Sequence, residues 1–331
     1  MTAEENAKSK KRKRKYIPGV AAFRFRPDPD WTVKRAQTMY RQRTKVVGNV
    51  DIDQVIYEDC IAGMKRLPEK CIDLIIADPP FGISFDGLES IYNRDDEFVV
   101  PGYEEVDEDY SSFTESWIYE LPRIMKEDAS AYVFSGWTNI ESVLAAARKA
   151  RLEVVNHIIW HYQFGVFTMK KFVTSHYHIL LLAKHPKKYY FHKIEHYIPD
   201  VWSIPRKYQP GKKKNGTVLP IRVVEKCIDF STEPGDLVLD PFMGNGTTAV
   251  AAKCNFRHFL GFEINKQLKP VIDENLNSVI SGENYTPYKS RLPSTETLKK
   301  KYPKAYKYLK ERGEIVHGAK RRSRSDSTST V

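Results

Sequence analysis

The tetrapeptide Asp78-Pro79-Pro80-Phe81 directly follows a short apolar run from Ile72 to Ile76. This pattern predicts a buried strand that ends in a rigid, polar turn. Because proline has no backbone N–H, the turn presents a carboxylate and carbonyl oxygens with few competing donors. Such acceptors suit the exocyclic amine of a nucleobase, and Phe81 supplies a flat face on which a flipped base can stack. A proline-rich loop that merely caps a core strand is the alternative.

A second stretch predicts a ligand site through its glycines. A turn at residues 241–246 separates a predicted strand from a predicted helix at 247–254. Gly244 and Gly246 allow the backbone to approach a ligand closely at the helix N-terminus. Glu263 ends the next predicted strand, where it can accept hydrogen bonds from ribose hydroxyls. The stretch therefore predicts a site for an adenosine-bearing cofactor.

The same glycines leave a nicotinamide-dependent dehydrogenase as an alternative. Gly244, Gly246 and Ala249 fit the dinucleotide-binding fingerprint. Asp240, however, would face a pyrophosphate unfavourably, whereas it suits a positively charged amino group. A dehydrogenase also gives no reason for the Asp-Pro-Pro-Phe turn.

The elements that must position these residues alternate between strands and helices. After a short strand at residues 54–57, Asp59 lies where open α/β sheets bind ligands, and it can equally cap the following helix. The alternation predicts a wound α/β sheet, with an antiparallel pair of strands at one edge. The later elements expected are helices near 113–126 and 139–150 and strands at 131–134, 154–160 and 177–183.

The net charge of +11 over 331 residues favours a polyanionic partner. Much of the excess lies in two runs, at residues 8–15 and 320–324. The first run can be a nucleic-acid arm, a localisation signal or a solubilising tail, and the sequence leaves these three open. No apolar stretch is long enough to span a bilayer, so we expect no membrane contact.

A basic and aromatic segment at residues 184–216 is the candidate for nucleic-acid contacts, with a solvated connector as the alternative. An acidic segment at residues 86–112 would repel phosphates, so we assign it to closure over the pocket or to a protein contact. The candidate DNA-binding residues are Lys187, Lys188, Arg206, Lys207, Lys212, Lys213 and Lys214.

Metal chemistry is not expected. His176 and His178 alternate on one predicted strand but lack a nearby third ligand, which favours packing or hydrogen bonding. The four cysteines are widely spaced and form no C-x-x-C pair, which is typical of buried thiols in a reducing compartment. They are Cys60, Cys71, Cys227 and Cys254.

With both motifs in view, the chain resembles the DNA amino-methyltransferases that use S-adenosylmethionine. In that family an Asp-Pro-Pro-aromatic motif holds the target amine, and a Phe-x-Gly-x-Gly turn holds the methionine part of the cofactor. Asp78 to Phe81 match the first motif, and Phe242-Met-Gly244-Asn-Gly246 matches the second. The catalytic motif comes first, as in the permuted beta arrangement. RNA base methyltransferases with the same motif usually have the opposite order.

The resemblance implies a Rossmann-like, seven-stranded class I methyltransferase sheet with a permuted motif order and a small DNA-recognition insert. It implies that Asp59 contacts the adenine of the cofactor and that Glu263 contacts its ribose. Leu219 stands where the family has a lysine, which weakens any role for its neighbours. The catalytic residues implied are Asp78, Pro79, Pro80 and Phe81; the methionine end of the cofactor is assigned to Asp240, Phe242, Gly244, Gly246 and Thr247.

The expected organisation is a basic extension at 1–50, a catalytic domain at 51–285 with target recognition at 184–216, and a basic extension at 286–331. The expected function is site-specific methylation of an exocyclic amine in double-stranded DNA. Asp78 favours adenine N6, and cytosine N4 stays open. An RNA base methyltransferase and an inactive DNA-binding module are more remote alternatives.

The same resemblance sets the expected partners and location. A restriction endonuclease that acts on the same site is a candidate partner, and the protein is expected to be a monomer or homodimer. It is expected in the cytoplasm near the nucleoid of a prokaryote, or in the nucleus if the source is eukaryotic.

Overall fold

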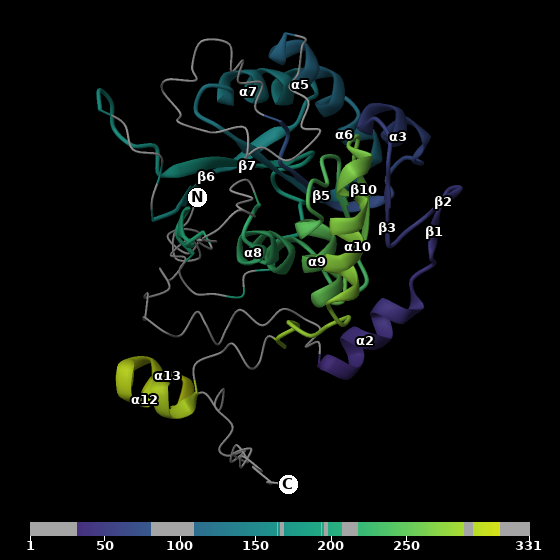
Figure 1. Cartoon of the computed structure of the whole chain (residues 1–331). Coiled ribbons are helices and arrows are strands. Elements are labelled where there is room, and N and C mark those ends of the chain that lie inside the picture. The colour runs from purple at the N-terminus through teal and green to yellow at the C-terminus, as the bar shows by residue number, and fades with distance from the viewer. Residues whose placement is uncertain are drawn as a thin grey trace, which may run out of the picture. The chain divides into compact units, whose positions relative to one another are not determined.

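The computed structural model describes residues 32–80, 109–163, 165, 169–192, 194, 198–206, 218–287 and 294–311. The chain forms two compact units (Figure 1). The larger one consists of Asp30–Lys193 and Tyr197–Tyr288. The described part of the smaller unit is mainly a pair of helices, α12 (Thr295–Lys301) and α13 (Pro303–Glu311), which bury Leu298 and Leu309.

An eight-stranded sheet forms the centre of the larger unit, in the order β3-β10-β9-β4-β5-β7-β6-β8. The strands from β3 to β5 are parallel, β7 is antiparallel to both of its neighbours, and β8 is parallel to β6. Their bounds are β3 Gln54–Ile56, β4 Ile72–Ala77, β5 Met125–Ser135, β6 Glu153–His161, β7 His176–Ala183, β8 Val201–Ser203, β9 Leu237–Asp240 and β10 His258–Phe262.

The wound α/β sheet and its antiparallel pair, β6 and β7, are confirmed. The sheet has one strand more than the seven expected. This strand is β8, a three-residue edge strand in which only Trp202 is buried. So short a strand has no alternation of apolar and polar residues from which it could be predicted.

The central strand β4 is apolar almost throughout because helices cover both faces of the sheet. Ile72 and Ile75 face one core, and Leu74 and Ile76 face the other. The first core lies against α3 (Cys60–Arg66), α5 (Tyr110–Ile118), α6 (Leu121–Ile124) and α7 (Ile140–Lys149). The second lies against α8 (Ile221–Ser231), α9 (Thr247–Cys254) and, after the 3-10 turn η3 (Lys266–Leu268), α10 (Lys269–Asn277).

The sheet unit begins earlier in the chain than the sequence indicates. A helix, α2 (Val33–Gln42), and a small hairpin, β1 (Val46–Val47) and β2 (Val50–Asp51), precede β3. The ring of Tyr40, in α2, stacks on His258 at 4.1 Å between centroids, and Arg43 Nη1 lies 3.0 Å from Asp73 Oδ2. Residues 32–50 are therefore packed against the sheet, although the sequence places them in an extension.

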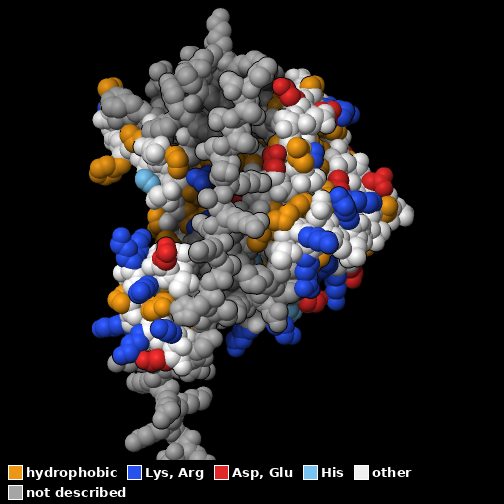
Figure 2. All heavy atoms as spheres, turned by 90° about the horizontal axis from the view of Figure 1, so that it is seen from below, with side chains coloured by type: hydrophobic (Ala, Val, Ile, Leu, Met, Phe, Trp, Pro, Cys, Tyr) orange, Lys and Arg blue, Asp and Glu red, His pale blue; other side chains and the backbone are white. Residues whose placement is uncertain are grey.

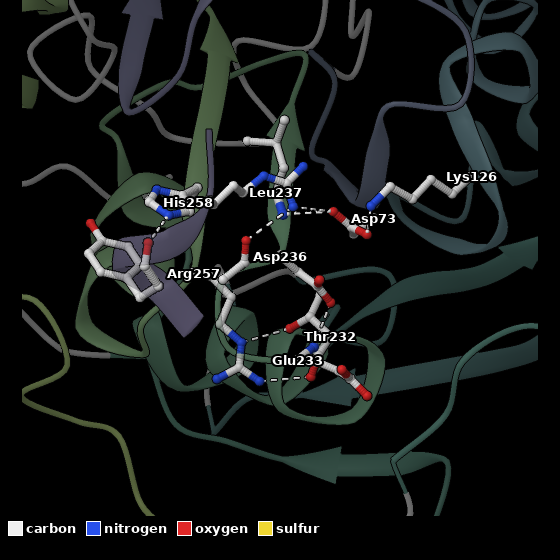
Figure 3. Close-up of polar contacts among 11 residues, drawn as sticks. Asp73, Lys126, Thr232, Glu233, Asp236, Leu237, Arg257 and His258 are labelled. Carbon is white, nitrogen blue, oxygen red and sulfur yellow. Dashed lines mark hydrogen bonds and ion pairs between the residues drawn. The ribbon is translucent and has the colours of Figure 1, made fainter. Parts of the chain in front are cut away.

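The amino ends of the parallel strands carry a dense polar network (Figure 3). The Asp73 carboxylate accepts hydrogen bonds from Leu237 N at 2.9 Å and from Lys126 and Arg43. Arg257 is buried and donates to two backbone carbonyls, those of Thr232 and Asn255, both at 2.7 Å. The polar groups at the amino ends of the strands are occupied by internal contacts, so we expect a ligand site at the carboxyl ends.

Candidate active site

Carboxylates follow four neighbouring parallel strands at their carboxyl ends. Asp59 comes after β3, Glu263 after β10, Asp240 ends β9, and Asp78 follows β4. Because β3, β10, β9 and β4 are adjacent and parallel, the four side chains lie together at the carboxyl ends of these strands. This end of the sheet, which we call the acidic edge, is opposite the amino ends that carry the polar network of Asp73.

Glu263 holds the glycine turn. Its Oε2 accepts a hydrogen bond from Gly244 N at 2.7 Å, and its Oε1 accepts one from Asn265 N at 2.8 Å. Burial raises the pKa of Glu263, and the backbone donors partly offset that rise. The backbone donors Gly244, Ile264 and Asn265 do not use all four lone-pair sites of the carboxylate, so a hydroxyl donor can still bind.

The turn itself requires glycine. Gly244 and Gly246 have φ angles of 53° and 82°, in the left-handed region that other residues rarely adopt. Gly246 is the N-cap of α9, and a Cβ added there would lie 3.2 Å from Ile272 Cγ2. The predicted close approach of backbone to a ligand is therefore available at the start of α9.

Asp240 lies below this turn and is 4% exposed. Its Oδ1 accepts a hydrogen bond from Phe242 N at 2.9 Å. Burial raises the pKa of Asp240 to about 7 and the Thr248 hydroxyl offsets part of the rise, while Glu263 adds to it. Thr247, predicted to bind the methionine end of the cofactor, is the first residue of α9. No lysine or arginine of the described residues forms an ion pair with Asp240.

Asp78 is the neighbouring carboxylate and directly follows β4. Burial raises the pKa of Asp78 to about 7, Asp240 raises it further, and Arg206 lowers it. Pro79 is buried and Pro80 is half-buried. Phe81, the predicted stacking partner, and the acidic segment up to residue 108 lie outside the described residues.

Arg206 lies above three aromatic rings beside Asp78. Its guanidinium carbon is 4.1 Å from the ring centroid of Tyr162, 5.0 Å from that of Tyr177 and 5.2 Å from that of Trp160. The sequence groups Arg206 with the candidate DNA-binding lysines. In the structure it lies over these rings, and its charge lowers the pKa of Asp78. Trp160 and Tyr162 are two residues apart, the strand spacing that puts side chains on one face, and that spacing could have identified the cluster.

The other predicted site residues lie at two opposite ends of the sheet, the acidic edge and the end that carries the polar network of Asp73. Phe242 packs edge-on against Trp117 of α5, with ring centroids 5.2 Å apart. Asp59 caps α3, since its Oδ1 accepts from Ala62 N at 2.8 Å, and its second oxygen is not used in that contact. Lys187 and Lys188 follow β7 at the edge opposite Asp78, because β7 runs antiparallel to β5. Lys207, Lys212, Lys213 and Lys214 lie outside the described residues.

The four cysteines are poor candidates for a nucleophile, because burial raises the pKa of each thiol. His178 Nδ1 lies 2.7 Å from His157 Nε2, and burial, followed by His157 and His176, lowers the pKa of His178 to about 4. Burial raises the pKa of Cys60 to about 12, which keeps this thiol protonated. The described residues contain no group of three His, Cys, Asp or Glu side chains that could hold a metal ion, and no helix among them is long and apolar enough to cross a membrane.

The family model described as DNA methylase matches residues 72–274, which include the Asp78 turn, the glycine turn and Glu263. The Type II methyltransferase M.HinfI of Haemophilus influenzae is 28% identical over 262 residues, 70% of this chain and 70% of that protein. The Type II methyltransferase M.HpaI of Haemophilus parainfluenzae is 28% identical over 248 residues, 69% of this chain and 76% of that protein.

Two solved structures share the fold. The complex of M1.HpyAVI with S-adenosylmethionine has a TM-score of 0.51 and 23% identity, covering 68% of this chain and 98% of that one. The PvuII DNA methyltransferase, described as cytosine-N4-specific, has a TM-score of 0.50 and 16% identity, covering 70% of this chain and 95% of that one.

Proposed function

The chain belongs to the DNA methylase family of N6 and N4 amino-methyltransferases, and we propose that it methylates adenine at N6 within a specific sequence of double-stranded DNA. The observation that carries the proposal is the position of Asp78 beside Asp240 at the carboxyl ends of the neighbouring strands β4 and β9. One carboxylate can hold the target amine while the other holds the cofactor.

S-adenosylmethionine is the cofactor of this family, and the residues at the carboxyl edge fit it. When bound, it supplies an electrophilic methyl group on a sulfonium. The buried Asp240 suits the cationic amino group of its methionine part, because a bound cation would offset the burial that raises the pKa of Asp240. Glu263 would accept from the ribose hydroxyls, and Gly244 and Gly246 would let the methionine part lie against the backbone.

Asp78 prepares the amine. An exocyclic amine on an aromatic base is a poor nucleophile, because its lone pair is delocalised into the ring. The Asp78 carboxylate and the Pro79 carbonyl can accept its two N–H bonds and so localise the lone pair. Holding donor and acceptor in line supplies roughly 7–11 kcal/mol of the barrier. The proton that leaves the methylated amine passes to Asp78, whose pKa of about 7 allows it to bind and then release a proton near neutral pH.

Adenine is favoured over cytosine by the first residue of the motif. Adenine-specific members of the family mostly have aspartate there, as this chain does at Asp78. The names of the two Haemophilus relatives favour a Type II system, so we also propose a restriction endonuclease of the same specificity as partner. Such a system operates on the chromosome in the bacterial cytoplasm.

The test is mass spectrometry of nucleosides from random duplex DNA treated with the protein and a methyl-labelled cofactor. We expect label in N6-methyladenine, at a rate about 10²- to 10⁴-fold lower with Asp78→Asn. Label only in N4-methylcytosine would overturn the base assignment and keep the chemistry. Label at cytosine C5 would overturn both, since that chemistry requires a thiolate and burial raises the pKa of Cys60 to about 12.

A further inference from the structure

The connection between β6 and β7 starts beside the active site. His161, the last residue of β6, pairs with His176, and Ser135 of β5 pairs with His178. Since β5 is parallel to β4, the connection at residues 162–175 leaves the sheet at the edge where Asp78 lies. In Figure 1 its described part projects beyond the ends of β6 and β7.

The tip of this connection exposes two large apolar side chains. Phe172 is 97% exposed and Met169 is 87% exposed, and the two lysines between them, Lys170 and Lys171, are exposed as well. Figure 2 shows hydrophobic side chains standing out at the left margin, the side on which Figure 1 has this connection. Single exposed apolar residues are common, but here two of them flank cations on one projection.

The base of the connection is held in place. Tyr162 N donates a hydrogen bond to Ser175 O at 2.9 Å, which extends the pairing of β6 and β7 beyond the sheet. The ring of Tyr162 lies 5.5 Å from Trp160 and 5.7 Å from Tyr177 between centroids. The tip therefore has a fixed root close to Arg206 and Asp78.

Duplex DNA is the partner whose chemistry matches the exposed cations and apolar side chains of this projection. The carboxylates Asp78, Asp240 and Glu263 repel phosphates, so cations from elsewhere must hold the backbone near the target base. Lys170 and Lys171 can supply two phosphate contacts. An apolar side chain inserted between base steps unstacks them and is the common means by which proteins deform DNA.

We propose, on the basis of the proposed function, that residues 169–173 form a DNA wedge. Phe172 and Met169 insert into the base stack beside the target and stabilise its flipped state. Lys170 and Lys171 contact the flanking phosphates. The wedge thus adds a nucleic-acid contact at the active-site edge of the sheet.

The wedge is tested with Phe172→Ala and Met169→Ala, alone and combined, on a duplex that contains the methylated sequence. A second duplex carries an abasic site opposite the target base, so that the target is already unpaired. We expect kcat/KM on the paired duplex to fall by about ten- to a hundredfold, and by less than about threefold on the abasic duplex. The matched control is Tyr119→Ala, which removes a 72% exposed aromatic ring after α5.

Two readouts need no methyl transfer. The fluorescence of 2-aminopurine at the target position should rise with the wild-type protein and rise less with Phe172→Ala. Replacing Lys170 and Lys171 by Ala should lower the slope of log Kd against log salt by about 0.9 for each phosphate that the variant no longer neutralises. Loss of activity on both duplexes, equal behaviour of Phe172→Ala and Tyr119→Ala, or an unchanged salt slope would overturn the wedge. Absence of methyl transfer to DNA by the wild type would instead overturn the proposed function, and the fluorescence and salt slope would still decide on the wedge.

Discussion

Asp78 is the residue on which the chemistry depends most directly. Replacing it by Asn keeps the shape and removes the charge that accepts the amine hydrogens. We expect kcat to fall by about 10²- to 10⁴-fold, the range for a lost acid-base group. The Kd for S-adenosylhomocysteine, measured by calorimetry, should stay within about threefold. Asp51→Asn, an exposed carboxylate before β3, is the control. A Kd that rises as steeply as kcat falls would assign Asp78 to the cofactor.

Arg206 is expected to set the pH range of the reaction. Its positive charge lowers the pKa of Asp78, against the rise caused by burial and by Asp240. Without that charge the pKa of Asp78 moves up, and the carboxylate form is reached only at higher pH. Arg206→Met should therefore shift the acid limb of the kcat–pH profile to higher pH and recover activity at alkaline pH, whereas Arg206→Lys should shift it less. An acid limb at the wild-type position would show that Arg206 does not act on Asp78.

The turn between β9 and α9 illustrates how a side chain can organise a whole element. Glu263 binds Gly244 N from the next strand, so it fixes the turn and also faces the site. Glu263→Ala should raise the Kd for S-adenosylhomocysteine by roughly ten- to a hundredfold, from the loss of a charge-assisted bond of about 1.5–3 kcal/mol. Glu263→Gln keeps an acceptor and should have a smaller effect. An unchanged Kd in both variants would remove Glu263 from the cofactor site.

The segment of α2 is expected to contribute to the free energy of unfolding. Arg43 follows it and binds Asp73 at 3.0 Å and Gly235 O at 3.1 Å. Arg43→Met should lower the free energy of unfolding in urea by about 1.5–3 kcal/mol. Arg41→Met, an exposed position in the same helix, should change it by less than about 0.5 kcal/mol. Equal stabilities would mean that the contacts of Arg43 with Asp73 and Gly235 do not stabilise the fold.

The sequence predicts elements whose signal is local. The apolar run of β4 and the glycines before α9 identify themselves, and the acids at the strand ends then follow from the topology of a parallel sheet. By contrast α2 is polar and buries only Ala36, so its packing against His258 depends on contacts between distant residues. The position of Arg206 is equally non-local, since β8 has to join the sheet before Arg206 reaches the rings of Trp160 and Tyr162.

For the whole molecule, the buried carboxylates of the acidic edge lower the stability of the fold near neutral pH, although the proposed reaction needs them. Burial raises the pKa of Asp78 and of Asp240 to about 7, well above the value of about 4 in an unfolded chain. Between these two values the folded state binds more protons than the unfolded state, so stability falls as pH rises from about 4 to 7. A cationic cofactor would offset part of this loss.

Asp240→Asn removes one of these titrations. We expect the cofactor-free variant to have a higher Tm than the wild type at pH 8, a smaller difference at pH 5, and a weaker affinity for S-adenosylmethionine. Differential scanning calorimetry at both pH values, with and without the cofactor, measures all three. A variant less stable than the wild type at pH 8 would mean that the bond from Phe242 N outweighs the burial of the charge.

The polar network around Asp73 and Arg257 (Figure 3) lies at the amino ends of the parallel strands. The reacting groups lie at the carboxyl ends of the same strands. Substitutions far apart in a protein change its stability almost additively. Adaptation to heat can therefore proceed through Asp73 and its partners while the specificity for a DNA sequence drifts at the opposite edge. The thermal stability of such an enzyme can change without a change in its DNA sequence specificity, and its specificity can change without a change in its thermal stability.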